Sequence, residues 1–204
     1  SGGRAPGHLV LREALENIRK LLDKAQGRQL LTIECYDLVC MAAEAVYSSG
    51  IREAATICLF SIDDGLMMYA KTGEWYKTSP WRARSNNSVV LVRSEVKKDQ
   101  YMRIFNATKQ WGEPGFYFTD DPDSGCNPCV EIGMSSKLTI TPSNKREIEK
   151  WAKKTNRTIP TLRVGDVHWG WQFCNLTETN CTKAKTEQEF YDDVRAAAII
   201  GTMQ

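Results

Sequence analysis

Two cysteines, an asparagine and a glutamate lie close together in residues 126–131, which read Cys-Asn-Pro-Cys-Val-Glu. Thiols can act as nucleophiles, reductants or metal ligands, and a carboxylate can move protons. Pro128 fixes its own φ and biases Asn127 toward an extended backbone. The sequence therefore predicts a stiff loop that presents reactive side chains and leads into a strand at residues 130–132.

Three interpretations of the two loop cysteines are open. Thiol oxidoreductases also have a Cys-x-x-Cys pair, but there the first cysteine begins a helix, whereas a strand is expected here. A zinc site would use Cys126, Cys129, Cys174 and Cys181, and the spacing of the last two is wider than that of a usual zinc knuckle. The third interpretation is a loop that contains two ordinary structural cysteines.

The composition indicates a globular chain without a membrane span. Of its 204 residues, 42% are hydrophobic and 25% are charged, which is enough for a buried core. A formal net charge of +2 gives no reason to expect nucleic-acid or membrane binding. An odd number of cysteines, seven, and no recognisable signal peptide predict free thiols in a reducing compartment, the cytoplasm.

The apolar periodicity predicts strands that alternate with helices. This order is typical of an α/β fold with a parallel sheet or barrel, whose loops at the strand ends carry the chemistry. The first helix is expected to pack through a leucine-rich face. Helices are expected at residues 9–26, 32–49, 65–70, 97–110, 143–154 and 187–200, and strands at 51–61, 88–93, 116–119, 130–132 and 169–173.

Two further segments carry charge in a suggestive pattern. Residues 75–88 are expected to form a loop that interleaves aromatic and basic side chains, which could stack a base or hold a phosphate. A solvated loop with an aromatic anchor is the simpler interpretation.

Residues 145–157 carry six positive and two negative side chains, a net charge of +4. A solvated basic face is preferred there over a partner or nucleotide-phosphate contact.

Short blocks along nearly the whole chain come in a specific order. They are Ser-Gly-Gly-Arg-Ala-Pro-Gly (1–7), Gly-Ile-Arg-Glu-Ala-Ala-Thr (50–56), Ala-Lys-Thr-Gly (70–73), Arg-Ala-Arg-Ser-Asn-Asn-Ser (82–88), Gly-Glu-Pro-Gly (112–115), Asn-Pro-Cys-Val-Glu-Ile (127–132) and Gln-Phe-Cys-Asn-Leu-Thr-Glu (172–178). This order resembles the large catalytic subunit of ribonucleotide reductases. The Asn-Pro-Cys-x-Glu form is most similar to the adenosylcobalamin-dependent class II.

The resemblance implies a fold and a place within it. Residues 1–204 would be an internal fragment of the catalytic domain, part of the ten-stranded α/β barrel of the ribonucleotide reductase type. Residues 134–167 would be a surface insertion in that barrel. The fragment alone is expected to be inactive, because regions that the family needs lie outside it.

The resemblance also assigns roles to four residues. Cys129 would be the transient thiyl radical that takes the 3′ hydrogen atom of the ribose, and Glu131 the general base on the 3′-hydroxyl. Asn127 would hydrogen-bond a ribose hydroxyl. Cys174 would protonate the departing 2′-hydroxyl and close a disulfide with a cysteine upstream of this fragment. Alternation along a strand would place Asn127, Cys129 and Glu131 on one side.

The resemblance further implies a cofactor and partners. Adenosylcobalamin would generate the radical, and the alternative is a radical from a separate metal-bearing subunit, as in class I. The substrate would be a ribonucleoside di- or triphosphate, with a nucleotide effector bound outside this fragment and a thioredoxin-like or glutaredoxin-like reductant. Cys126 departs from the family pattern and leaves open an off-pathway disulfide with Cys129. A non-enzymatic zinc module remains the alternative from another class.

Overall fold

The structure, a computed structural model, describes residues 7–47, 55–170, 174 and 177–203. Its centre is a three-stranded parallel sheet of β1 (Ile57–Ser61), β2 (Asn86–Val92) and β3 (Gly115–Thr119), in that order. Phe60 of β1 is paired with Val89 of β2, and Val89 is paired with Phe116 of β3. The predicted α/β fold with a parallel sheet is thus confirmed in these three strands.

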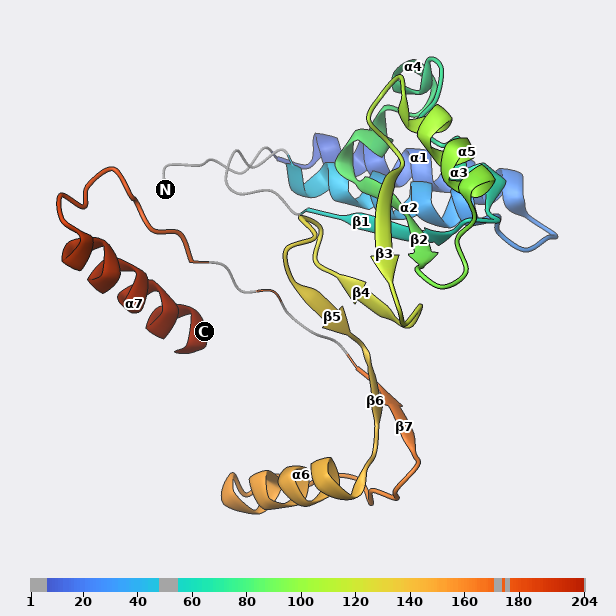
Figure 1. Cartoon of the computed structure of the whole chain (residues 1–204). Helices are drawn as coiled ribbons and strands as arrows, with labels where there is room; N and C mark the ends of the chain where they lie inside the picture. The colour runs from blue at the N-terminus through green and yellow to red at the C-terminus, as the bar shows by residue number, and fades with distance from the viewer. Residues whose placement is uncertain (1–6, 48–54, 171–173, 175–176, 204) are drawn as a thin grey trace.

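Helices cover one face of this sheet (Figure 1). The hydrophobic core lies between them, and it includes Val89 and Leu91 of β2, Met68, and Ile104, all at most 2% exposed. Each such side chain contributes about 1.5–3 kcal/mol through burial. The elements involved are α1 (Leu9–Ala25), α2 (Thr32–Tyr47), α3 (Gly65–Met68), α4 (Trp75–Thr78), the 3₁₀ helix η1 (Pro80–Arg84) and α5 (Lys98–Thr108).

Most of the expected elements form close to their predicted positions, and local chemistry explains their ends. Asp64 caps α3, because its carboxylate accepts a hydrogen bond from the Met67 amide at 3.0 Å. The segment 75–88 is different, since the expected loop is two short helices, α4 and η1, followed by the start of β2. The strand expected at 51–61 covers only Ile57–Ser61, and residues 51–54 lie outside the described chain.

The packing face of α1 is shifted from the predicted one. Ile18 and Leu21 of the expected stripe are half-buried. The expected stripe includes Leu11 and Leu15, which are 50% and 56% exposed, whereas Ala14 and Ala25 are buried. Helix α1 contacts α2. The buried side of α1 therefore runs through its alanines, and Leu11 and Leu15 at the edge of that side remain exposed among the described residues.

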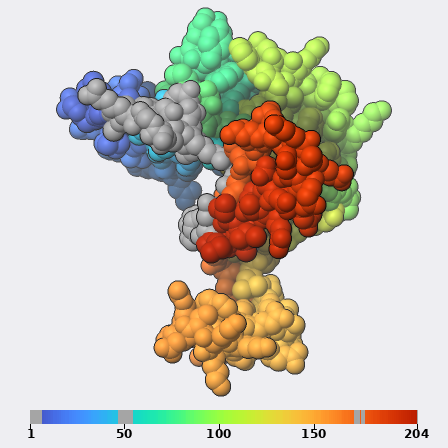
Figure 2. Space-filling model, turned by 90° about the vertical axis from the view of Figure 1, so that its left-hand side faces the viewer, coloured from blue at the N-terminus to red at the C-terminus, as the bar shows by residue number. Residues whose placement is uncertain are grey.

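The second half of the chain leaves the sheet in two steps. A hairpin of β4 (Ser124–Cys126) and β5 (Gly133–Ser135) follows β3. An arm, defined as residues 136–170, then stands apart from the body in both views (Figures 1 and 2). The arm contains β6 (Lys137–Thr139), α6 (Pro142–Lys154) and β7 (Val167–Trp169), with β6 and β7 paired antiparallel. The strand expected at 169–173 therefore ends at Trp169, and residues 171–173 lie outside the described chain.

The last element is α7 (Glu187–Met203), which extends the predicted helix by three residues. The Thr186 hydroxyl accepts a hydrogen bond from the Glu189 amide, as expected of an N-terminal cap. No residue of α7 is buried among the described residues. Within the same residues, no helix is long and apolar enough to cross a membrane.

Candidate functional site

The reactive segment forms the turn between β4 and β5. We call residues 127–132 the cysteine loop. The amide of Asn127 donates to the Ile132 carbonyl at 3.1 Å, and the Val130 amide donates to the Asn127 carbonyl at 2.9 Å. The Asn127 side chain closes the loop as well, because its Oδ1 accepts from the Ile132 amide at 2.9 Å. Asn127 is only 2% exposed and therefore holds the loop from inside.

The strand predicted at residues 130–132 is wrong, because the chain turns there. Val130 has φ 68°, in the left-handed region that β-branched residues rarely adopt. A turn at this residue ends the alternation that was expected to relate Cys129 to Glu131. Both residues are exposed on the loop, so the thiol and the carboxylate are accessible from outside the hairpin.

Two side chains of the sheet fix the backbone around the cysteine loop. The Asn86 side chain, at the start of β2, donates through Nδ2 to the Pro128 carbonyl at 2.9 Å. The Tyr117 hydroxyl, from β3, donates to the Gly125 carbonyl at 3.0 Å. Burial raises the pKa of Tyr117, which keeps its hydroxyl protonated as a donor. Both residues project from the sheet face opposite the helices. Val89 and Leu91 of β2 point into the core, so alternation places Asn86 on the other face, together with Val90, the register partner of Tyr117.

No sequence signal singles out Tyr117, and Asn86 is notable in the sequence only as part of the block 82–88. Alternation along β2 and β3 could have indicated that both face away from the core. That alternation could not reveal what would cover this face, because the hairpin comes from a later part of the chain.

Cys174 lies beside the cysteine loop although it is 47 positions from Asn127 along the chain. The Asn127 side chain donates through Nδ2 to Cys174 Sγ at 3.5 Å. Cys174 is half-buried, whereas Cys129 is exposed. The structure thus brings the side-chain amide of Asn127 to the thiol of Cys174. No hydrogen bond joins Cys129 to Cys174 within the described chain.

Cys126 lies at the end of β4 and is half-buried. Burial raises the pKa of its thiol, and the negative charge of Glu131 raises it further. Cys126 is therefore held as a thiol rather than a thiolate near neutral pH. The exposed Cys181 contacts the Thr179 carbonyl.

The two alternative cysteine chemistries lack the geometry that they need. No three metal-ligating side chains are grouped so that they could hold an ion in the part of the chain that is described, which includes Cys126, Cys129, Cys174 and Cys181. A thiol oxidoreductase would have its first cysteine at a helix start, but Cys126 ends a strand. All seven cysteines are free.

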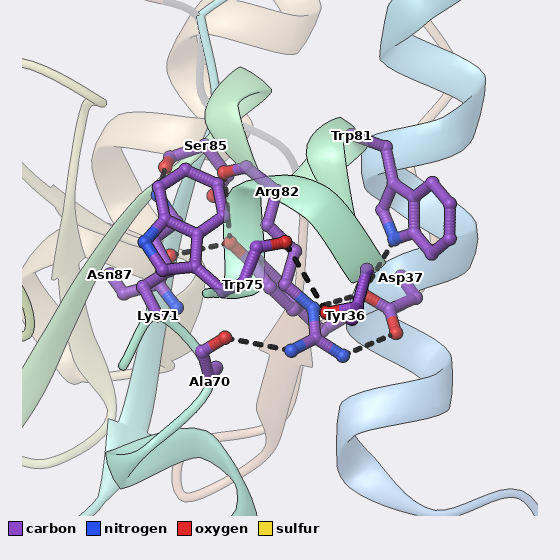
Figure 3. A network of polar contacts seen from close by, with 10 residues as sticks. Tyr36, Asp37, Ala70, Lys71, Trp75, Trp81, Arg82, Ser85 and Asn87 are labelled. Carbon is purple, nitrogen blue, oxygen red and sulfur yellow. Dashed lines mark hydrogen bonds and ion pairs between the residues drawn. The ribbon is translucent and has the colours of Figure 1, made fainter. Parts of the chain in front are cut away.

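The aromatic and basic segment 75–88 is part of an internal network, not a ligand site (Figure 3). Arg82 binds both carboxylate oxygens of Asp37, at 2.6 and 2.7 Å, and donates to the Ala70 carbonyl at 2.7 Å. Trp81 donates to the same carboxylate at 2.8 Å, and Arg84 is paired with Glu44. Since both guanidinium groups are paired with carboxylates of the protein itself, the interpretation as a base or phosphate site is not supported.

Lys71 extends this network through two further contacts. Its ammonium group contacts the Ser85 carbonyl and pairs with the Glu113 carboxylate at 2.5 Å, and its side chain is only 6% exposed. The Tyr36 hydroxyl donates to Asn87 Oδ1 at 2.6 Å. Burial raises the pKa of Tyr36 and also raises that of Cys40, to about 11. Cys40 is therefore a core thiol, whereas Cys35 on the same helix is exposed.

Comparisons with known proteins add an independent finding. The adenosylcobalamin-dependent ribonucleoside-triphosphate reductase of Levilactobacillus brevis is 28% identical over 152 residues, which cover 66% of this chain and 20% of the relative. The protein of the same name from Lacticaseibacillus paracasei is 28% identical over 198 residues, covering 84% and 26%. A probable adenosylcobalamin-dependent ribonucleoside-triphosphate reductase of Dictyostelium discoideum is 25% identical over 197 residues, covering 82% and 25%.

These matches confirm the resemblance that the ordered blocks indicate: the chain is related to ribonucleotide reductases. Within that class, the relatives carry the name of the adenosylcobalamin-dependent enzymes. The chain spans only about a fifth to a quarter of the length of these curated relatives. No protein-family model matches the chain, and no solved structure does.

Proposed function

We propose that this chain is part of the catalytic domain of a ribonucleotide reductase that makes deoxyribonucleotides for DNA synthesis. The hydrogen bond between Asn127 and Cys174 carries the proposal. It joins the loop that would hold the radical to the block that would supply reducing equivalents. The names of the relatives favour a ribonucleoside triphosphate over a diphosphate as substrate.

The proposed roles are the ones that the resemblance to ribonucleotide reductases implies for four side chains. Cys129, as a thiyl radical, takes the 3′ hydrogen atom of the ribose, and Glu131 accepts the proton of the 3′-hydroxyl. Cys174 protonates the 2′-hydroxyl, which leaves as water. Asn127 orients the Cys174 thiol through one amide N–H and has its second N–H for a ribose hydroxyl.

The step balances with two thiols. Cys174 and a second cysteine, which we do not assign to any residue of this chain, give two electrons and two protons and become a disulfide. Cys129 returns its hydrogen atom to the 3′ carbon, so that one ribose becomes one deoxyribose and one water. A thioredoxin-like or glutaredoxin-like protein then reduces the disulfide.

The position of Cys129 fits adenosylcobalamin as the radical source. The thiol lies exposed at the tip of a hairpin, where a bulky cofactor can reach the sulfur without displacing core residues. When bound, this cofactor supplies an organic radical that can take a hydrogen atom from a thiol. Asn86 and Tyr117 would keep the loop rigid while this happens.

The proposal extends to the fold, the effector site and the cellular compartment of the protein that contains this chain. The parallel strands β1 to β3 would form part of a ten-stranded α/β barrel, and residues 134–167 would be a surface insertion in it. A nucleotide effector would bind outside residues 1–204. The cytoplasm, which is reducing, suits a site with free thiols.

The test uses the intact protein that carries this sequence, with adenosylcobalamin tritiated at the 5′ carbon. We expect tritium to exchange into water in the wild type and in Cys181→Ser, a matched change at another exposed cysteine, but not in Cys129→Ser. Equal exchange in Cys129→Ser would overturn the role of Cys129. Reductase activity without any exchange would replace the cofactor with a separate radical-bearing subunit.

A further inference from the structure

The arm concentrates positive charge that the whole-chain value conceals. Residues 136–170 contain eight lysines and arginines and three acidic residues, a net charge of +5, whereas the complete chain has only +2. The remainder is therefore net negative. Figure 2 shows the arm projecting from the body, so this charge is presented at a distance from the acidic part of the molecule.

Helix α6 has an inner and an outer side. The arm has a small apolar centre of its own, in which Ile140, Ala152 and Leu162 are 1%, 5% and 7% exposed. Ala152 and the half-buried Ile148, one turn earlier, define the inner side of α6. The apolar residues of this helix are therefore already used within the arm.

The outer side of α6 is a basic stripe. Four exposed cations project from it at spacings of three or four residues, and a fifth follows the helix end: Arg146, Lys150, Lys153, Lys154 and Arg157. Within the helix, from Arg146 to Lys154, the stripe extends about 12 Å at the helical rise of 1.5 Å per residue. Of the two acidic residues of α6, Glu149 pairs with Lys145, and Glu147 lies at the edge of the stripe.

An aromatic ring borders these cations. Trp151 is 51% exposed and lies between Lys150 and Lys154 in sequence, on the flank of the stripe. A large exposed indole beside cations is the combination that holds unpaired bases, since the ring stacks on a base while the cations contact phosphates. The geometry suits a polymer better than a mononucleotide, because the cations follow a convex helix instead of converging on one point.

A membrane surface fits this arrangement less well. A helix that lies in a bilayer interface inserts a continuous apolar face, with its basic residues on the other side. The apolar side of α6 is directed into the arm. Trp151 is the one large apolar side chain of this helix that is exposed. An anionic bilayer would thus be held by charge alone.

We propose that the outer face of α6 binds single-stranded nucleic acid, with the basic stripe on successive phosphates and Trp151 stacked on a base. The inference is independent of the reductase proposal, because it uses no residue of the cysteine loop. The net charge of +2 gave no reason to expect nucleic-acid binding, because this value sums the basic arm with the acidic remainder of the chain.

The experiment measures fluorescence anisotropy of a labelled 20-nucleotide single-stranded DNA with the intact protein. The double variant Lys150→Gln/Lys154→Gln has a matched control in Lys20→Gln/Lys24→Gln on α1, where two exposed lysines have the same spacing and the second also lies in the last helical turn. We expect at least tenfold weaker binding for the arm variant and less than twofold change for the control. The slope of log K against log salt should fall by about 1.4 in the arm variant, since each lost phosphate contact removes about 0.7.

A second variant separates nucleic acid from other anions. Trp151→Leu should weaken DNA binding at least fivefold and leave binding to heparin, which has no bases, unchanged. Circular dichroism of each variant must match the wild type. No binding by the wild type in 50 mM salt, equal losses in the α1 control, or tighter binding to vesicles containing anionic phosphatidylserine would overturn the proposal. DNA binding that Trp151→Leu leaves intact would assign the stripe to acidic polymers in general and overturn it too.

Discussion

The Arg82 network and the cysteine loop lie on opposite faces of the same sheet and use polar groups in opposite ways. In the network, Asp37 and Lys71 are buried and Arg82 is half-buried, and each of these charged groups meets a partner of opposite charge. In the cysteine loop, neutral hydrogen bonds hold the backbone: the Asn86 side chain donates to the Pro128 carbonyl, and the Asn127 side chain accepts from the Ile132 amide. The charged Glu131 and the thiol of Cys129 are left exposed.

The difference indicates how stability and reactivity are separated in this chain. A buried ion pair holds the protein in one geometry, and removing either partner leaves an uncompensated charge that destabilises the folded state. A loop held by its backbone can instead present unpaired side chains to a ligand. We therefore expect mutations in the Arg82 network to destabilise the whole fold. Mutations in the cysteine loop should mainly change the loop itself.

The largest effect is expected from Arg82→Ala. This change leaves the Asp37 carboxylate, with a side chain 8% exposed, without its two-point partner. Breaking such a pair costs about 3–5 kcal/mol of unfolding free energy. Arg93→Ala is the control, because its ion pair with Asp120 is exposed and is expected to contribute at most about 1 kcal/mol. Urea denaturation measures both, and similar losses in the two variants would contradict the comparison.

A smaller loss is expected from Asn127→Ala. It removes the acceptor for the Ile132 amide and opens the cysteine loop, at a cost of about 2 kcal/mol. Cys174→Ala removes only the long contact to Asn127 Nδ2 and should cost less than about 1 kcal/mol. Urea denaturation would show the difference. If Cys174→Ala were the more destabilising change, the loop would depend on the thiol contact more than on its own turn.

Val130→Gly should change stability in the other direction. The φ of 68° is strained for valine, and a glycine relieves about 1–2 kcal/mol of strain while it adds some entropy to the unfolded chain. A net gain of about 1 kcal/mol is expected by thermal or urea unfolding. The matched change Val164→Gly, at an exposed valine without positive φ, should lower stability by about 0.5–1 kcal/mol. A loss in both variants would show that the loop is not strained at Val130.

The smallest effect concerns an exposed ion pair with the same two-point geometry as Arg82 and Asp37. Arg28 binds both oxygens of Glu34, at 2.6 and 2.8 Å, and lowers the pKa of Glu34 to about 2 from an ordinary value of 4.5. A depressed carboxylate pKa gives stability that is present above the unfolded value and is lost as the pH falls toward about 2. The stability difference between wild type and Glu34→Gln should therefore shrink from pH 6 to pH 2. A difference that is independent of pH would exclude this linkage.

Sequence reasoning predicted the regular elements well where a local signal was strong. Helix α6 has Thr141 as its cap and Pro142 in its first turn, and the predicted start is only one residue away. The same reasoning failed at residues 130–132, because a valine and an isoleucine favour a strand. The side chain of Asn127 turns the backbone by bonding Ile132 five positions later. It also failed to predict the ion pairs of Arg82 and Arg84, since the sequence does not show whether an arginine binds a ligand or a carboxylate of the same protein.

The sequence by itself determined which reactive groups are present, the α/β alternation and the relationship to ribonucleotide reductases, because each depends on residue types in order along the chain. The tertiary structure alone decided which of these groups meet. It placed Cys174 beside Asn127, paired Arg82 with the buried Asp37, and put the basic stripe of α6 on the outside of an arm. The physical reason is that contacts between distant residues depend on how elements pack, and packing is a property of the complete set of buried surfaces that no local pattern contains.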